Sequence, residues 1–194
     1  MQKNIILSGV GGQGILSIAA VIGVAALTEE LYMKQSEVHG MSQRGGDVQS
    51  HLRLSDRPIA SDLIPLGQAD LIISLEPMES LRYIPYLKPE GWLVTNSEPF
   101  LNIPNYPDIS KIYDEIAKLP HSILLDVENI AKQAGSVRTA NIVILGAATP
   151  FLGIAFEKIE EGIHTIFNRK GDEIVNMNLK ALKLGLAQVK ITTN

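Results

Sequence analysis

The first two thirds of the chain alternate between short apolar runs and longer apolar segments. Short runs rich in Ile, Leu and Val are typical of buried strands, whereas the longer segments are long enough for helices. Strands that alternate with helices predict a mostly parallel, Rossmann-like sheet of the α/β class, with helices on both faces. We expect strands near residues 4–8, 31–34, 48–54, 71–74, 92–95 and 122–125, and helices near 15–31, 77–87 and 112–119.

From about residue 136 the pattern becomes helical throughout. Segments 137–148, 157–167 and 172–189 are each long enough for a helix, and the last has apolar residues at steps of three and four. That spacing places the apolar side chains on one stripe of the helix. We expect a single domain over residues 1–194, whose helical C-terminal part caps the sheet or reaches toward a partner.

Composition and charge narrow the classes of function. The formal net charge of −4 argues against a nucleic-acid partner, because phosphate binding needs clustered Lys and Arg. The sequence contains no cysteine, which excludes cysteine-ligated iron–sulfur clusters, thiolate zinc sites and disulfides on this chain. The N-terminal apolar run is too short for a signal peptide, and no segment approaches the ~20 apolar residues of a membrane span. We therefore expect a cytoplasmic protein without membrane contact.

A glycine-rich segment, Gly-Val-Gly-Gly-Gln-Gly, starts at Gly9 and fits G-x-G-x-x-G between a predicted strand and a predicted helix. In this setting Gly9 permits a tight turn, and Gly11 lets backbone N–H groups approach a ligand closely. The third glycine of the motif, Gly14, would let the helix pack against the strand. With Gly12 and Gln13 completing the turn, a pyrophosphate could lie at the helix N-terminus.

The same glycines also have a purely structural explanation, because they can pack a first strand against its helix without any ligand. A dinucleotide site should in addition show an acidic residue about 20 positions further on, at the end of a second strand. Glu29 and Glu30 are placed to end the helix, and Glu37 lies in a polar segment. Since none of them closes a predicted strand, nicotinamide dinucleotide binding is an alternative rather than the first choice.

The segment 37–47 is predicted to be a loop beside the second strand. Loops at the carboxyl ends of parallel strands are where α/β proteins usually bind ligands. Arg44 offers a forked donor for phosphate or carboxylate, and His39 could donate a hydrogen bond. The alternative is a structured turn in which Arg44 pairs with Glu37 or Asp47. Ligand binding or partner contact is the preferred interpretation.

Other polar residues give weaker signals. His51 is expected on the polar face of its strand, and no two histidines have metal-ligand spacing on one helix face. Ser8 and Ser17 have no recognisable base partner, which argues against a serine hydrolase. Asp126 follows a strand and is placed to cap the next helix. None of these residues outweighs the glycine turn and the 37–47 segment.

Three segments together carry a family resemblance. Ile-Leu-Ser-Gly-Val-Gly-Gly-Gln-Gly-Ile-Leu at 6–16 and Glu-Val-His-Gly-Met-Ser-Gln-Arg-Gly-Gly at 37–46 resemble the gamma-type domain of 2-oxoacid:ferredoxin oxidoreductases. The segment Asn-Ile-Val-Ile-Leu-Gly-Ala at 141–147 is similar to a further family segment. The form of 37–46 is similar in particular to the indolepyruvate branch of the family. One glycine motif alone would be a weak signal, but its combination with the second segment is specific.

The resemblance implies a two-subunit enzyme. A large subunit would carry thiamine diphosphate, magnesium and 4Fe-4S clusters, decarboxylate an aryl 2-oxoacid, pass electrons to ferredoxin and yield an aryl-acetyl-CoA. This chain would hold no cofactor firmly, would supply no catalytic residue and would be inactive alone. It lacks the Gly-Asp-Gly pattern of a thiamine diphosphate site, since 171–173 reads Gly-Asp-Glu.

The resemblance also suggests a site for coenzyme A, the co-substrate, or for the large subunit. The candidate residues are Gly9, Gly11, Gly12, Gln13 and Gly14 in the turn, with His39, Gln43 and Arg44 in the adjacent loop. Two alternatives stay open: a stand-alone nicotinamide-dependent oxidoreductase, and a structural partner that stabilises the large subunit without binding any small molecule.

Overall fold

The structure, a computed structural model, describes residues 1–39, 46–101 and 103–189. Within these ranges six strands form one sheet: β1 (Gln2–Val10), β2 (Tyr32–His39), β3 (Asp47–Ser55), β4 (Ala69–Ser74), β5 (Leu87–Asn96) and β6 (Ser122–Leu125). The α-helices in the described ranges are α1 (Ile15–Thr28), α2 (Pro77–Arg82), α3 (Ile109–Ala117), α4 (Val127–Ala134), α5 (Ala140–Leu152), α6 (Phe156–Phe167) and α7 (Asp172–Ala187). Short 3₁₀ turns lie at η1 (Ile84–Tyr86), η2 (Val137–Thr139) and η3 (Asn168–Lys170).

The strand order of the sheet is β2-β3-β1-β4-β5-β6. Strands β1, β4, β5 and β6 pair in parallel, whereas β3 is antiparallel to both β1 and β2. The predicted mostly parallel α/β sheet is therefore confirmed, with one antiparallel strand inserted beside β1. Because β1 is bordered by β3 and β4, its carboxyl end lies near the middle of the sheet, a place where open α/β sheets often bind ligands.

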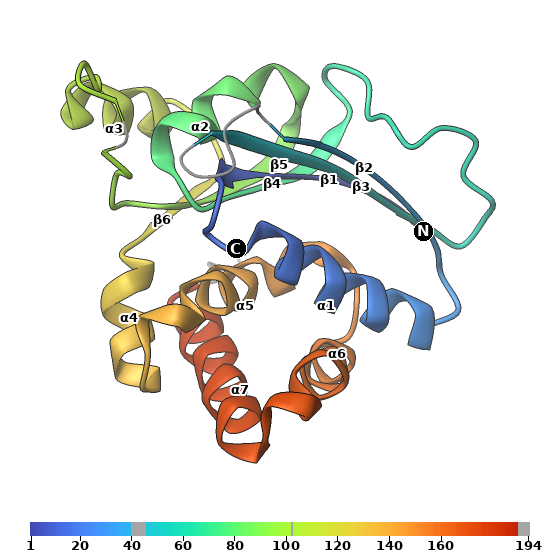
Figure 1. The fold of residues 1–194 in the computed structure, drawn as a ribbon. Coiled ribbons are helices and arrows are strands. Elements are labelled where there is room, and N and C mark those ends of the chain that lie inside the picture. The colour runs from blue at the N-terminus through green and yellow to red at the C-terminus, as the bar shows by residue number, and fades with distance from the viewer. Residues whose placement is uncertain (40–45, 102, 190–194) are drawn as a thin grey trace.

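Helices cover both faces of the sheet, as expected (Figure 1). Helices α1, α5, α6 and α7 form a thick layer on one face, and the shorter α2 and α3 lie on the other. Along β1 the side chains alternate between the two cores, with Leu7 in the larger cluster and Ile6 in the smaller one. This alternation follows from the two-residue period of a strand and explains why β1 is apolar on both faces.

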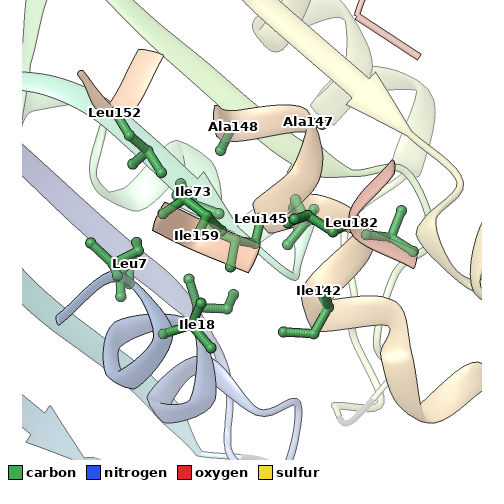
Figure 2. Close-up of a cluster of buried hydrophobic side chains, with 14 of the residues drawn as sticks. Leu7, Ile18, Ile73, Ile142, Leu145, Ala147, Ala148, Leu152, Ile159 and Leu182 are labelled. Carbon is green, nitrogen blue, oxygen red and sulfur yellow. The ribbon is translucent and has the colours of Figure 1, made fainter. Parts of the chain in front are cut away.

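The predicted helical C-terminal part forms most of the thick layer. Helix α5 is buried along nearly its whole length and packs against the sheet on one side and α7 on the other. The crossing of α5 and α7 is close because Gly146 faces the Leu182 carbonyl, and Gly185 faces the Val143 carbonyl. Figure 2 shows the core that this layer completes, with Leu7, Ile18, Ile73, Ile142, Leu145, Ile159 and Leu182 among the buried side chains.

Two expectations about the second and third strands were wrong. Part of the predicted 37–47 loop is strand, because β2 continues to His39 and Glu37 pairs in register with Ser50 of β3. His51 is buried, with 6% of its surface exposed, and not on a polar face. Its Nδ1 accepts a hydrogen bond from the Ile64 N–H at 3.0 Å, and burial lowers the pKa of the ring. The connection after β3 covers this face, so the sequence alternation did not reveal that His51 would be enclosed.

None of the helices in the described ranges is long and apolar enough to cross a membrane.

Candidate functional site

The glycine turn joins the end of β1 to the start of α1. Gly14 caps α1 with φ 85° and ψ 27°, a left-handed conformation that favours glycine. The Gly11 N–H donates to the Gly46 carbonyl at 2.9 Å, which ties the turn to the residue just before β3. The turn is therefore held by backbone bonds at the carboxyl end of β1, where the first N–H groups of α1 point away from the helix.

Gln13 has a structural role that the sequence did not indicate. Its Oε1 accepts a hydrogen bond from the Val10 N–H at 2.7 Å, and its Nε2 donates to the Leu75 carbonyl at 3.1 Å. The side chain thus bridges the carboxyl ends of β1 and β4. A Cβ on Gly9 would lie 2.7 Å from this Oε1, so Gly9 is required by the bridge. Both polar atoms of the Gln13 side chain are therefore engaged within the protein, and its role is to hold the turn in place.

The third glycine packs against a different element from the one expected. The amide Nδ2 of Asn141, on the first turn of α5, donates to the Gly14 carbonyl at 3.1 Å. A Cβ on Gly14 would lie 2.7 Å from the same Nδ2. The expectation that Gly14 lets α1 pack on β1 is therefore corrected: the close neighbour is α5, and the positive φ of Gly14 is a second reason for glycine.

A cavity of about 580 Å³ lies beside this turn. Its wall includes residues 12–14 after β1, Leu75 after β4 and Asn96 at the end of β5, so it lies at the carboxyl ends of three parallel strands. Helical residues complete the wall on the side of the thick layer. The cavity is about the size of a small-molecule site and lies at the edge where such sites are found.

Four helices begin at the wall of this cavity. The lining residues on them belong to the first or second turn in every case: Ser17 in α1, Val127 and Glu128 in α4, Ala140 and Asn141 in α5, and Ile174, Met177 and Asn178 in α7. A helix N-terminus presents unpaired N–H groups and a partial positive charge. The carboxylate of Asp126 caps α4, and Asp172 and Glu173 lie in the first turn of α7, whereas α1 and α5 have neither a side-chain cap nor an acidic first turn. The starts of α1 and α5 therefore favour an anionic ligand such as a phosphate.

Charged side chains in the wall support the same interpretation. The cationic residues of the lining are Arg138, on η2, and Lys170, at the end of η3, and they stand against a single carboxylate, Glu128. Both cationic residues are exposed, and the Lys170 Nζ lies 5.2 Å from the centre of the Phe167 ring. The buried amides of Asn141 and Asn178 add hydrogen-bonding groups. This set of residues can bind and orient an anion. A metal ion is not favoured, because no group of three or more potential metal ligands occurs among the described residues.

The structure brings together part of the site predicted from sequence. Gly12, Gln13 and Gly14 line the cavity, while Gly9 and Gly11 shape the turn beside it. The side chain of His39, and the whole of Gln43 and Arg44, lie outside the described residues.

The sequence prediction missed the other half of the wall, which includes Arg138, Asn141, Lys170 and Asn178. Asn141 did have a signal, because it opens the third segment of the family resemblance. The remaining residues lie in ordinary helical sequence and enter the site only through tertiary packing.

A second polar cluster lies under α2, on the opposite face of the sheet. Glu79 is 5% exposed and binds the Arg82 Nε at 2.8 Å. The Tyr83 hydroxyl donates to the carboxylate of Asp47 at 3.1 Å. Burial raises the pKa of Glu79 above its ordinary value, and Arg82 opposes this rise while Asp47 adds to it. Burial and Asp47 likewise raise the pKa of Tyr83. The cluster fixes the first residue of β3 against α2.

Comparison with known proteins places this fold and its cavity in a family. The family model described as pyruvate ferredoxin/flavodoxin oxidoreductase matches residues 4–188. A relative from Archaeoglobus fulgidus named indolepyruvate oxidoreductase subunit IorB is 38% identical, over 97% of this chain and 96% of its own length. The match runs through both the glycine turn and the helical layer.

Solved structures show the same fold. The gamma subunit of a keto/oxoacid ferredoxin oxidoreductase from Geobacter sulfurreducens is 27% identical, with a TM-score of 0.68 over 96% of this chain and 97% of that one. A 2-oxoglutarate:ferredoxin oxidoreductase from Magnetococcus marinus, solved with 2-oxoglutarate, coenzyme A and succinyl-CoA, has a TM-score of 0.78 at 22% identity and covers 99% of this chain and 32% of that one. This chain belongs to the pyruvate ferredoxin/flavodoxin oxidoreductase family, and its homologues include IorB subunits of indolepyruvate oxidoreductase.

Proposed function

We propose that this chain is the small subunit of a ferredoxin-dependent oxidoreductase that acts on indolepyruvate or another aryl pyruvate. The observation that carries the proposal is the 38% identity to an IorB subunit over nearly the full length of both chains. The absence of cysteine agrees with it, because 4Fe-4S clusters must then lie on another subunit. We assign thiamine diphosphate and magnesium to that large subunit as well.

The complex would oxidatively decarboxylate the aryl 2-oxoacid, pass two electrons to ferredoxin and transfer the aryl-acetyl group to coenzyme A. The thiamine diphosphate and clusters of the large subunit would supply the carbon–carbon cleavage and the electron transfer. This chain contributes no catalytic residue in the proposal. Its part is to bind and orient coenzyme A, whose thiol accepts the acyl group on the partner.

The cavity beside the glycine turn is the proposed coenzyme A site. Coenzyme A carries phosphates, and the wall offers the uncapped N-termini of α1 and α5 together with Arg138 and Lys170. The related Magnetococcus marinus enzyme holds coenzyme A in its solved structure, which supports the choice of ligand. The backbone of residues 11–14 would form one side of the anion site. In the same proposal His39, Gln43 and Arg44 contact coenzyme A phosphates or the large subunit.

Reconstitution tests the proposed function. The chain and its large subunit are purified separately, and the reduction of ferredoxin is measured with indolepyruvate and coenzyme A. We expect no turnover by this chain alone and coenzyme A-dependent turnover after mixing. Turnover by the isolated chain at the rate of the complex would contradict the proposal. A mixture that forms a complex but does not reduce ferredoxin with any of the aryl 2-oxoacids tested would also contradict the proposal.

Binding measurements separate the alternatives. The strand order argues against a nicotinamide dinucleotide, because β3 lies between β1 and β2 and places Glu37 two strands away from the glycine turn. We expect titration of nicotinamide dinucleotides into the pure chain to show no binding of consequence. Hydrogen exchange of the complex is then compared with and without coenzyme A. If this chain is a purely structural partner, coenzyme A should not change the exchange of its backbone amides. The proposal instead predicts that coenzyme A slows the exchange of amides in the cavity wall.

A further inference from the structure

Helix α7 carries a buried polar residue in the middle of its apolar stripe. The buried positions of the helix are Val175, Asn178, Ala181, Leu182 and Gly185, at steps of three and four, and Asn178 is the polar member of this set. Asn178 is 5% exposed and lines the cavity. The pattern that packs α7 into the thick layer therefore does not explain why this position holds an asparagine.

The two polar atoms of the Asn178 side chain have different surroundings. Its Nδ2 donates to the Ile174 carbonyl, one turn back on the same helix, at 2.7 Å. Because that carbonyl can only accept, it fixes which end of the amide faces it. Within the described part of the chain Oδ1 accepts no hydrogen bond, and it is not one of the fully enclosed polar atoms without a partner. Oδ1 therefore keeps contact with solvent on the side of the cavity that Asn178 lines.

Stability does not account for Asn178 in this stripe. The Ile174 carbonyl already accepts the backbone hydrogen bond of the α-helix, so the bond from Nδ2 satisfies the amide more than it strengthens the helix. Asparagine is also a weaker helix former than leucine, and a buried amide with one unmatched end is costly. A leucine would continue the stripe without these costs. The fold thus leaves the Oδ1 acceptor to the cavity.

An acceptor selects a different part of a ligand from the part that the starts of α1 and α5 select. A carbonyl oxygen repels phosphate oxygens and is satisfied by an N–H group. Coenzyme A, on whose proposed binding this inference rests, carries N–H groups in its pantetheine amides and in the amino group of its adenine. We propose that Asn178 is a specificity-determining residue whose Oδ1 accepts a hydrogen bond from an N–H group of bound coenzyme A. The cavity then requires an N–H donor in its ligand in addition to the phosphates.

Two substitutions remove the acceptor in different ways. Asn178→Leu puts an apolar group of similar size in its place, and Asn178→Ser keeps a hydroxyl that can bond the Ile174 carbonyl but is too short to replace Oδ1. Asn176→Leu is the matched control, because Asn176 is exposed on the same helix and does not line the cavity. In the reconstituted enzyme we expect both Asn178 variants to raise the Michaelis constant for coenzyme A about tenfold, since a ligand N–H is left unmatched. The control should keep the wild-type constant.

Inhibition by fragments of coenzyme A identifies the group that Asn178 binds. The competitors are inorganic diphosphate, adenosine bisphosphate and S-methylpantetheine, which has no free thiol and cannot accept the acyl group. We expect the inhibition constant of diphosphate to be the same in wild type and variants, because diphosphate has no N–H group. A raised constant for the adenosine compound assigns the donor to adenine, and a raised constant for the pantetheine compound assigns it to an amide. Either result supports the proposal.

Three results would overturn the inference. The first is an unchanged Michaelis constant for coenzyme A in both Asn178 variants. The second is an equal rise in the constant for diphosphate, which would mean that the substitution distorts the anion site. The third is a rise for coenzyme A that neither fragment shares. Asn178→Ser decides the matter if Asn178→Leu lowers the melting temperature. The proposed function fails separately, if coenzyme A does not slow hydrogen exchange of the cavity wall in the wild-type complex.

Discussion

Single residues in the proposed coenzyme A site act through position as much as through charge. Both ends of the Gln13 amide are hydrogen-bonded, one to Val10 at the end of β1 and the other to Leu75 after β4, and so the side chain fixes the backbone that lines the cavity. Arg138 and Lys170 instead reach the site as exposed cations. Substitution of the first kind should disturb the fold of the turn, and substitution of the second kind should disturb binding alone.

Removal of the two cations should raise the Michaelis constant for coenzyme A and leave the fold intact. We expect Arg138→Ala and Lys170→Ala each to raise this constant by about tenfold or more in the reconstituted enzyme, because a charge-assisted hydrogen bond contributes about 1.5–3 kcal/mol when it is made and about 1.4 kcal/mol is a factor of ten. Arg169→Ala is the matched control, since Arg169 is exposed, neighbours Lys170 and does not line the cavity. Steady-state kinetics at varied coenzyme A provide the measurement. An equal effect of Arg169→Ala would indicate long-range electrostatics instead of a contact.

Protonation of Glu79 should make stability depend on pH. The pKa of Glu79 is raised in the folded state above its ordinary value of 4.5, mainly by burial. A raised carboxyl pKa stabilises the fold fully below the unfolded value, and this contribution is lost as pH rises through the folded value. Glu79→Gln removes the titration, so the stability of the variant relative to wild type should increase across that window and then level off.

Urea unfolding from about pH 4 to about pH 8 measures this effect. Glu115→Gln is the control, because Glu115 is an exposed carboxylate paired with Lys118 on α3 and the neighbouring turn. This variant measures the effect of removing a carboxylate from the surface. A difference between Glu79→Gln and wild type that stays flat across the pH range would mean that the buried carboxylate keeps an unshifted pKa.

At the scale of the elements, glycines determine how closely the helices pack. A Cβ on Gly146 of α5 would meet the backbone carbonyl of Leu182, and a Cβ on Gly162 of α6 would meet that of Val21 in α1 at 2.6 Å. A backbone atom cannot move aside as a flexible side chain can. The two helix pairs of the thick layer, α5 with α7 and α1 with α6, therefore depend on glycine at their crossings.

Gly146→Ala should destabilise the chain despite the better helix propensity of alanine. Alanine gains up to about 1 kcal/mol within a helix, but overpacking typically costs about 1–3 kcal/mol, and here α7 itself must shift. Gly23→Ala in α1 is the matched control, because its Cβ would meet only the flexible Met33 side chain, at 3.1 Å. We expect a lower free energy of unfolding for the first variant and an unchanged or slightly higher one for the second. A stabilised Gly146→Ala variant would show that the crossing is looser than described.

At the scale of the whole molecule, one sheet separates two cores of unequal size. The larger core holds α1, α4, α5, α6 and α7 against one face, and the smaller lies under α2 and α3. Residues from the same strand contribute to both, as Leu7 and Ile6 of β1 do. Loss of either layer would expose one whole face of the sheet, so the two cores should unfold together.

Unfolding of the isolated chain should therefore be a single cooperative transition. Trp92, the one tryptophan of the sequence, lies in β5 and stacks on Phe151 at 4.2 Å and on His121 at 4.9 Å. Its fluorescence reports the sheet and the end of α5, while far-ultraviolet circular dichroism reports all helices. We expect the two urea transitions to coincide, as two-state unfolding requires. A separate early loss of helical signal would show that the helical layer unfolds independently.

The sequence by itself determined the elements and the class of the fold. The repeat of apolar residues along a strand or a helix is a local pattern, so it can be read from the sequence. The runs at 4–8, 71–74 and 92–95 predicted β1, β4 and β5. The helical C-terminal part was predicted with nearly correct bounds. The glycine turn also has a local signature, since the motif, its strand and its helix are contiguous. The absence of cysteine by itself excluded cysteine-ligated iron–sulfur clusters on this chain, because such ligation requires that residue type.

Only the tertiary structure decided the rest. The insertion of β3 between β1 and β2, and the burial of His51 beneath the next connection, depend on pairings between distant segments. Gly14 and Asn141 are 127 positions apart in the sequence, yet the hydrogen bond between them closes one wall of the cavity. The convergence of four helix N-termini has no signature in any single segment, because each helix start looks ordinary until packing brings all four together.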